Sequence, residues 1–423
     1  MTFKIITLGC KVNIYESEVM KEKLLQAGFK ETIDNSDIVI INTCSVTNMA
    51  DVKSRKMIRR EKKENPQSIL AVCGCSAENH RLELEDLGID ILIGNKDKSN
   101  IVSLIREYQN DHKPIIKFYD TRKLPFEDMK VDKFTSHTRG FIKIQDGCNN
   151  YCSYCIIPYV RGNIRSKDIN VALKEAQELV TNNHKEIVLT GIHTGSYGVG
   201  YDFDLVDLIN KMSTIPGLKR IRLSSIEITE LNDKFMELLK NNTILCDHLH
   251  IPLQSGSEKI LKLMNRKYDK SRYESIINQI RAIRPEISIT TDVIVGFPGE
   301  TESDFNECLD FCRKIKYAKI HVFPYSKREG TKAASMPNQL DNKTKKDRAR
   351  KLIELSNELE EAYNQKFLGR NMDVLVEEYK DSCSIGHTSN YLKVVIETKV
   401  PTNEFYNVKI TNASSSEVTG KIN

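Results

Sequence analysis

Residues 147–162, GCNNYCSYCIIPYVRG, decide the fold because they place Cys148, Cys152 and Cys155 in the spacing C-x3-C-x2-C. Three thiolates on one short loop can bind three irons of a four-iron cluster and leave the fourth iron without a protein ligand. A structural zinc site is the alternative, but closed zinc sites use four protein ligands, and no further cysteine or histidine lies near this loop. The pattern therefore predicts an iron–sulfur cluster with one open coordination position.

The spacing resembles the signature of the radical S-adenosylmethionine (SAM) superfamily. This resemblance implies that the amino and carboxylate groups of SAM bind the open iron. It also implies that one electron from the cluster cleaves SAM to a 5′-deoxyadenosyl radical. We therefore expect a radical SAM enzyme.

Composition favours a multidomain protein in a reducing compartment. The chain has 423 residues, of which 39% are hydrophobic, enough for several buried cores. Most of its 11 cysteines lie in patterns unlike disulfide frameworks, which is typical of a cytosol. No stretch of about 18 apolar residues predicts a membrane span, and the start MTFKIITLGCKV does not resemble a signal peptide. We expect a cytoplasmic protein with no membrane partner, and the net charge of +5 alone does not indicate nucleic acid.

Residues 1–133 predict a doubly wound α/β domain. The apolar runs FKIITL, DIVIIN, SILAV and IDILI alternate with amphipathic segments, as parallel strands covered on both faces do. Cys10, Cys44 and Cys75 each follow one of the first three strands. Because ligands of open parallel sheets gather at the carboxyl ends of strands, these cysteines should converge. The spacing predicts a second three-thiolate site, and burial as ordinary core cysteines is the alternative.

Residues 134–366 and 367–423 predict two further domains. Six apolar runs, GFIKIQ, EIVLTGI, KRIRLSS, DHLHIPL, SITTDVIVGF and KIHVFPY, alternate with helical segments and predict a partial (β/α)6 barrel. The loop of Cys148 follows the first run, at the carboxyl face where barrel active sites lie. Residues 341–367 predict one long connecting helix, and the last part predicts a small all-β barrel or sandwich.

Longer motifs resemble those of the radical SAM methylthiotransferases over essentially the whole chain. TLGCKVN, INTCSVT and CGCSAE resemble the cluster domain of that family, and CNNYCSYCIIPYVRG resembles its radical core. HIPLQSGSEKILKLMNRKY and TDVIVGFPGETESDF resemble its later barrel motifs, and GHTSNYLKVVIE resembles its terminal TRAM module. KVNIYES, LTGIHTGSYG and RLSSIEI are most similar to the MtaB branch, which acts on N6-threonylcarbamoyladenosine in tRNA.

The resemblance implies an activity and its cofactors. The triplet at 148–155 would bind the [4Fe-4S] cluster that reduces SAM, and the three strand-end cysteines would bind a second [4Fe-4S] cluster that carries or positions sulfur. One SAM would supply a methyl group and another the radical that activates C2–H of N6-threonylcarbamoyladenosine at tRNA position 37. The implied partners are the tRNA anticodon stem-loop and an electron donor such as flavodoxin or ferredoxin. Cys73, where the branch often has a small residue, is an alternative to Cys75.

Seven residues are candidates for SAM contacts. Tyr154 stands where the family packs an aromatic ring against the cofactor adenine, and ordinary packing is the alternative. The turn after the fifth barrel strand contains glycines, which allow a backbone to approach a ligand closely. The candidates are Tyr154, Gln254, Asp292, Gly296, Pro298, Gly299 and Glu300.

A basic run follows the strand that ends at Cys44 and is opposed only by Glu61. Most charge runs are solvated helix faces, whereas the family resemblance favours tRNA binding here. The terminal residues 370–423 are not basic, with six Lys or Arg and seven Asp or Glu. The candidate RNA-binding residues are Lys53, Arg55, Lys56, Arg59, Arg60, Lys62 and Lys63.

Three other functions fit parts of this pattern. A cobalamin-dependent radical SAM methylase has a similar layout, but the sequence lacks a D-x-H-x-x-G cobalamin motif. A non-catalytic iron–sulfur RNA-binding protein would not need the motifs expected to face SAM. The nearest alternative is methylthiolation of another substrate, either N6-isopentenyladenosine 37 in tRNA or an aspartate of a ribosomal protein.

Overall fold

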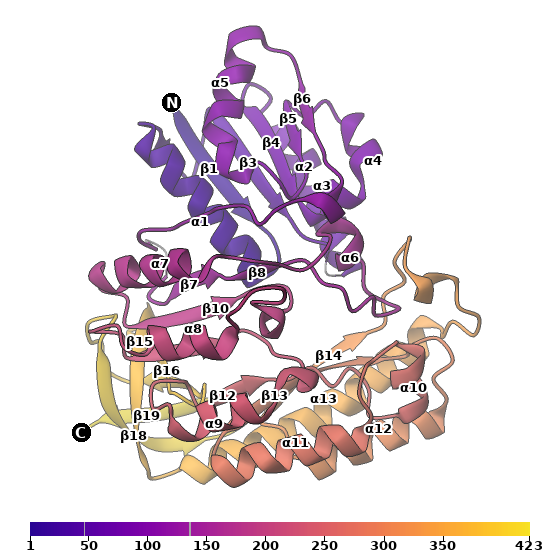
Figure 1. Ribbon diagram of the computed structural model, residues 1–423, viewed down its shortest axis with the longest axis vertical. Coiled ribbons are helices and arrows are strands. Elements are labelled where there is room, and N and C mark those ends of the chain that lie inside the picture. Colours follow the sequence, from indigo (N-terminus) through magenta and orange to yellow (C-terminus); the bar gives the residue numbers. More distant parts are fainter. Residues whose placement is uncertain (46, 135–136) are drawn as a thin grey trace.

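The computed structural model describes residues 1–45, 47–134 and 137–423; Val46 of the INTCSVT motif lies outside them. Its first part is a parallel sheet with strand order β2-β1-β3-β4-β5-β6 (Figure 1). The strands are β1 (Thr2–Thr7), β2 (Lys30–Glu31), β3 (Ile38–Thr43), β4 (Ile69–Gly74), β5 (Ile91–Ile93) and β6 (Ile115–Lys117). The helices are α1 (Lys11–Gln26), α2 (Asn48–Glu64), α3 (Cys75–Asn79), α4 (Arg81–Glu85) and α5 (Ile101–Asp111).

Helices cover both faces of this sheet, which confirms the predicted doubly wound fold. Met20 of α1 and Leu104 of α5 belong to one buried core, whereas Ile58 of α2 and Leu84 of α4 belong to another. The chain reverses its direction of winding between β1 and β3, because β2 lies on one side of β1 and all later strands lie on the other. Ligands of such sheets bind outside the strand ends at this switch point.

The second part is an open barrel of two three-stranded parallel sheets, β7-β10-β11 and β12-β13-β14. A single bridge between Ile221 and Leu245 joins the two sheets, so six strands form the partial barrel that the sequence predicts. The strands are β7 (Gly140–Lys143), β10 (Glu186–Thr190), β11 (Arg220–Leu223), β12 (His248–His250), β13 (Ser288–Val295) and β14 (Lys319–Pro324), with a short ribbon of β8 (Gln145–Asp146) and β9 (Arg165–Ser166).

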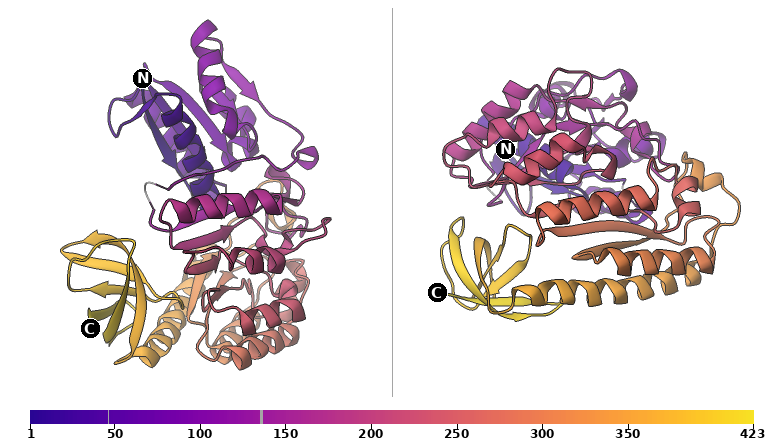
Figure 2. Two further views of the ribbon diagram at one scale, coloured as in Figure 1. Left: turned by 60° about the vertical axis from the view of Figure 1, so that its left-hand side comes forward. Right: turned by 60° about the horizontal axis from the view of Figure 1, so that its bottom comes forward.

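Helices line the outside of this open barrel (Figure 1). Several begin with side-chain caps: Thr301 and Asp304 form a reciprocal capping box at α12, and Asp168 caps α7. The long predicted helix is present as α13, which packs along β14 and leads to the terminal domain (Figure 2). The helices are α6 (Ile157–Val160), α7 (Ile169–Thr181), α8 (Leu205–Met212), α9 (Asp233–Asn241), α10 (Glu258–Leu263), α11 (Lys270–Ile283), α12 (Glu302–Ile315) and α13 (Asn342–Asn364).

The third part is a small closed barrel with strand order β15-β16-β17-β19-β18. It docks against the open barrel, where Arg220 donates to the carbonyl of Asp373 at 2.7 Å and Arg222 donates to that of Thr388 at 3.1 Å. In the described part of the chain, no helix has both the length and the apolar character required to cross a membrane. The strands are β15 (Asn371–Lys380), β16 (Cys383–His387), β17 (Lys393–Ile396), β18 (Phe405–Ala413) and β19 (Val418–Ile422).

Candidate active site

Two glycines with left-handed backbones bring the strand-end cysteines to one edge of the first sheet. Gly9 has a φ of +97°, and a Cβ there would lie 2.3 Å from Sγ of Cys44. Gly74 has a φ of +103°, and a Cβ there would lie 2.4 Å from the carbonyl oxygen of Thr43. Only glycine fits both the conformation and the space. Cys10 and Cys44 therefore lie at the switch point between β1 and β3, and Cys75 begins α3 after β4.

Cys73 lies in a different environment from its neighbour Cys75. Its side chain is buried in the core that contains Phe3 and Ile40, and Sγ is 3.7 Å from Oδ1 of Asn42. Burial raises the pKa of Cys73 to about 12. Cys75 instead packs against Ile156 at the joint with the second domain. This geometry favours Cys75 as the member of the strand-end triplet.

The second triplet lies on the loop that follows β7 and β8. The amide of Cys148 donates to Gly162 at 3.0 Å, and the amide of Cys155 donates to Cys152 at 2.9 Å, so the loop folds back on itself. Burial and the adjacent Cys152 raise the pKa of Cys155 to about 12. Iron binds cysteine as the thiolate, so cluster binding releases the proton of this thiol.

The donor set of each triplet fits an iron–sulfur cluster better than a single ion. Thiolates are soft ligands that favour iron–sulfur clusters, zinc and copper(I). Among residues 1–45, 47–134 and 137–423, no three Cys, His, Asp or Glu side chains are grouped as one metal ion requires. A four-iron cluster binds each thiolate to a different iron, so its ligands need not meet at one point.

The two triplets lie on opposite sides of the joint between the first two domains. Cys75 packs against Ile156 and Val160, which follow Cys155 closely in sequence. The Arg328 guanidinium, whose pKa burial lowers, is within electrostatic range of Cys155, Cys44 and Cys75. Each triplet also has one arginine donor: Nε of Arg161 is 3.1 Å from Sγ of Cys75, and Nη1 of Arg266 is 3.3 Å from Sγ of Cys152.

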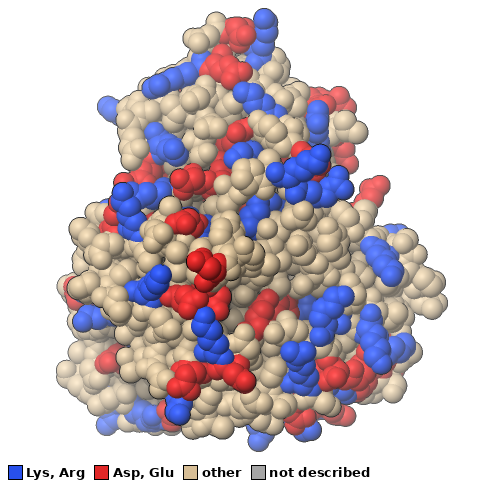
Figure 3. All heavy atoms as spheres, in the orientation of Figure 1, with Lys and Arg blue, Asp and Glu red and all other residues tan. Residues whose placement is uncertain are grey.

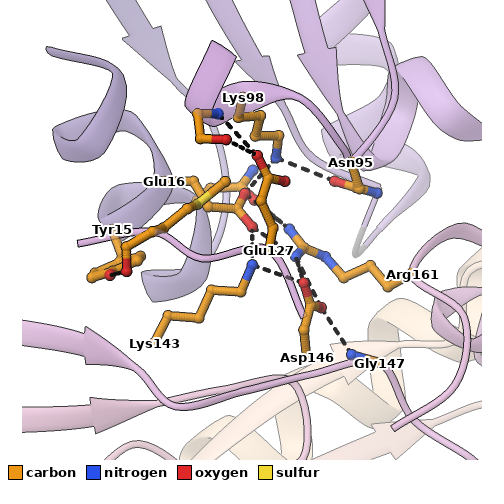
Figure 4. Close-up of polar contacts among 12 residues, drawn as sticks. Tyr15, Glu16, Asn95, Lys98, Glu127, Lys143, Asp146, Gly147 and Arg161 are labelled. Atoms are coloured by element: carbon orange, nitrogen blue, oxygen red, sulfur yellow. Dashed lines mark hydrogen bonds and ion pairs between the residues drawn. The ribbon is translucent and has the colours of Figure 1, made fainter. Parts of the chain in front are cut away.

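Arg161 belongs to a buried network of charged side chains (Figure 4). It is fully buried, and its Nη1 atom donates to Glu16 of α1 at 2.9 Å and to Asp146 of β8 at 3.2 Å. Lys143 donates to the same two carboxylates, each at 2.7 Å. Lys98 completes the network through Glu16. With Arg165, which pairs with Asp146 at 3.5 Å, the network contains four cations and two carboxylates, and it joins the first sheet to the open barrel.

Burial removes the charged groups of this network from water, which costs free energy unless they pair with one another. Although burial opposes ionisation, Arg161 and Lys143 hold the pKa values of Glu16 and Asp146 well below their usual range. The cations outnumber the carboxylates by two, and Arg161 also places its Nε atom 3.1 Å from Sγ of Cys75. We did not predict these residues from the sequence, although Lys143 and Asp146 interrupt the apolar run GFIKIQD. An anionic cluster on the strand-end triplet would balance the remaining charge.

A cavity of about 1150 Å³ lies where the three domains meet. Cys10 and Lys11 line it from the first sheet, His250 and Asp292 from the open barrel, and Tyr391 from the small barrel. It exceeds the usual range of small-molecule sites, about 300–1,000 Å³. Of the residues predicted from sequence, only Cys10 and Asp292 line it, and the Asp292 carboxylate pairs with Nε2 of His250 at 3.3 Å.

The other SAM candidates lie outside this cavity. Tyr154 packs in an apolar cluster with Phe297 and Tyr325. The Glu300 carboxylate accepts the amide of Gly296 at 2.8 Å and pairs with Arg348 of α13 at 2.6 Å, so it holds the turn after β13. Gln254, Gly296 and Gly299 have left-handed backbones, with φ of +66°, +71° and +80° respectively. Pro298 lies between the two glycines, in the turn after β13.

The basic run lies on α2 but extends away from the cysteines. The helix begins beside Cys44 and rises about 1.5 Å per residue, so Lys63 lies about 20 Å along its axis. Arg60 pairs with Glu64 at 2.9 Å, whereas Arg59 is exposed and has no ion pair within the described ranges. On the face drawn in Figure 3, positive and negative side chains are interspersed.

An open six-stranded parallel barrel with a cysteine triplet after its first strand defines a radical SAM enzyme. The family model described as "Radical SAM superfamily" matches residues 142–312, and "Uncharacterized protein family UPF0004" matches residues 2–94. The chain is 41% identical to the threonylcarbamoyladenosine tRNA methylthiotransferase MtaB of Bacillus subtilis, over 92% of this chain and 89% of that protein. It is 35% identical to the tRNA-2-methylthio-N(6)-dimethylallyladenosine synthase of Clostridium tetani, over 99% and 96%. The chain therefore belongs to the radical SAM methylthiotransferase family, as its motifs suggest.

A solved structure supports the fold. The radical SAM methyltransferase TsrM of Kitasatospora setae, with cobalamin and a [4Fe-4S] cluster bound, has a TM-score of 0.57 at 14% identity and covers 79% of this chain and 76% of its own. This likeness concerns the fold alone. SAM and two [4Fe-4S] clusters are the cofactors of the family to which the chain belongs.

Proposed function

We propose that this protein adds a methylthio group to C2 of N6-threonylcarbamoyladenosine at position 37 of tRNA. The observation that carries the proposal is the cavity between the three domains, which has Cys10 of the strand-end triplet in its wall. The higher identity to the MtaB protein, 41% against 35% for the dimethylallyladenosine synthase, supports this substrate. An adenosine beside an anticodon is unstacked enough to enter such a cavity.

The two triplets would hold the two clusters. Cys148, Cys152 and Cys155 would bind the [4Fe-4S] cluster whose electron cleaves SAM. The three strand-end cysteines would bind the second [4Fe-4S] cluster. When bound, the first cluster supplies an electron for radical formation and the second holds sulfur close to the base.

Side chains of the chain itself would bind and orient the substrate. The buried ionic network fixes the first sheet against the open barrel, so the cavity wall at Cys10 keeps its place relative to β13. Thr290 bridges His248 at 3.1 Å and His250 at 2.9 Å, which fixes both imidazoles in the cavity wall. Tyr391 packs against His387 of the small barrel and His248 of the open barrel, with ring centroids 4.7 Å apart in each pair, and so fixes the small barrel against this wall.

The partners follow from this substrate. The anticodon stem-loop would enter from the side where the small barrel borders the cavity, with the exposed part of α2 as a further contact. A flavodoxin or ferredoxin would supply the electron, and the reaction would take place in the cytoplasm. Seven residues remain proposed SAM contacts, although only Asp292 among them lines the cavity.

Mass spectrometry of tRNA nucleosides from cells with and without the gene tests the proposal. Loss of methylthiolated threonylcarbamoyladenosine, restored by the wild-type gene but not by Cys152→Ala, is the expected result. If methylthiolated isopentenyladenosine disappears instead, the substrate is wrong and the chemistry stands. If neither nucleoside changes, the substrate is not tRNA, and a ribosomal-protein aspartate is the alternative.

A further inference from the structure

Lys11 is a cation of the cavity wall that has no ion pair among the residues the structure describes. It is the first residue of α1, directly after Cys10, and it lines the cavity. Its ammonium group makes no hydrogen bond or ion pair with any described residue. Its side chain is partly buried. A lysine in such a position gains free energy if a ligand brings an anionic group to it.

Two arginines near Lys11 are already matched by carboxylates. Arg222 pairs with Glu186 at 2.7 Å, and Arg139 pairs with Glu377 at 3.0 Å. The amino terminus of α1 adds positive potential, because Cys10 provides no side-chain cap for the first amides. This part of the wall therefore favours an anion, and Lys11, directly after Cys10, is in a position to bind it.

The proposed substrate carries an anion in a suitable place. A threonylcarbamoyl group ends in a free carboxylate, whereas an isopentenyl group has no charge. In adenine, C2 and C6 flank the same ring nitrogen, N1, so the substituent on N6 shares an edge of the base with the carbon that reacts. If the base presents C2 to the triplet that contains Cys10, its N6 substituent approaches the residues next to Cys10.

We propose that Lys11 binds the carboxylate of the threonylcarbamoyl group and so selects this substrate over an adenosine with an uncharged N6 substituent. This role rests on the proposed function and makes Lys11 the residue that recognises the N6 substituent. Two other roles of Lys11 give different results. A lysine that binds an RNA phosphate would strengthen binding of every loop alike. A lysine that only balances an anionic cluster would not distinguish between loops.

Binding of synthetic anticodon stem-loops to the anaerobically reconstituted protein tests this role. Four loops differ only at position 37: threonylcarbamoyladenosine, its carboxylate methyl ester, isopentenyladenosine and adenosine. The wild-type protein should bind the first at least about tenfold more tightly than the ester, because a hydrogen bond to a charged group contributes about 1.5–3 kcal/mol. Lys11→Gln should remove this preference, and Lys11→Arg should keep most of it.

A matched control is Lys23→Gln, which removes a lysine near the other end of α1. It should leave all four affinities unchanged. Iron content and the electron paramagnetic resonance spectrum of each variant show whether both clusters are present. If Lys11→Gln loses a cluster, equal affinity of the wild-type protein for the acid and ester loops still overturns the inference, and Lys11→Arg with both clusters present still supports it by keeping the preference.

Two results would overturn the inference. One is equal affinity of the wild-type protein for the acid and ester loops, and the other is an equal loss for all four loops in Lys11→Gln. Failure of the proposed function has a separate signature. In that case the wild-type protein would form no methylthiolated product from the threonylcarbamoyladenosine loop in the presence of SAM and a reductant, whatever its affinities.

Discussion

Replacing Arg161 tests whether the buried ionic network holds the first two domains together. Arg161→Met keeps a similar length but removes the donors to Glu16, Asp146 and Cys75. Removing one member of a buried ion pair costs about 3–5 kcal/mol. Lys143 stays within reach of both carboxylates, so neither is left unpaired. The expected loss of stability is therefore at the lower end, about 3 kcal/mol.

Urea unfolding of the iron-free protein under reducing conditions measures this loss without any contribution from the clusters. Two probes are needed, because a chain of several domains need not unfold in one step. Arg313→Met is the matched control, since Arg313 pairs with Asp310 on the surface, where its side chain is 56% exposed. Exposed pairs contribute about 0–1 kcal/mol. If Arg161→Met unfolds within about 0.5 kcal/mol of the wild type, the network does not hold the joint.

Three further predictions concern single side chains. Cys75→Ser should lower the iron bound per chain by about half, because one of two four-iron clusters loses a ligand; Cys73→Ser should leave it unchanged, and the reverse result in an iron assay would exchange their roles. Arg59→Ala should reduce the salt dependence of tRNA binding by about 0.7–0.9 in log–log slope if it contacts one phosphate; an unchanged slope in a salt titration would place RNA elsewhere. The pairing with Asp51 raises the pKa of His80, so its contribution is fully present below the unfolded value of about 6.5 and is lost as pH rises through the folded value. His80→Gln should therefore destabilise the protein at pH 6 and not at pH 9, and an equal loss at both would show that the charge plays no part.

The fold was predictable because its signals are local. Short apolar runs alternate with amphipathic segments through the first two domains. In the last domain, hydrophobic residues recur at every second position, as in strands with one buried face. Topology then placed the strand-end cysteines: with the order β2-β1-β3, the switch point falls between the strands that precede Cys10 and Cys44. The same rule placed the second triplet at the carboxyl face of the barrel.

The cavity and the ionic network were not predictable, because they depend on how the domains pack. Lys98 lies in no motif and Arg161 lies at the end of the cysteine-loop motif, and only tertiary contacts bring both to Glu16. Tyr391 lines the cavity because the small barrel docks against the open barrel, through Arg220 and Arg222. Glu300, in contrast, was singled out from its motif as a SAM contact, and the structure shows that its carboxylate pairs with Arg348.

Product formation by the purified protein tests the central claim most directly. The protein is reconstituted with iron and sulfide, then incubated without oxygen with SAM, a reductant and tRNA that carries threonylcarbamoyladenosine at position 37. Mass spectrometry of the digested tRNA should show the methylthiolated nucleoside, and tRNA with unmodified adenosine should give none. Methylthiolation of isopentenyladenosine tRNA alone, or of neither tRNA by a protein with both clusters intact, would contradict the account.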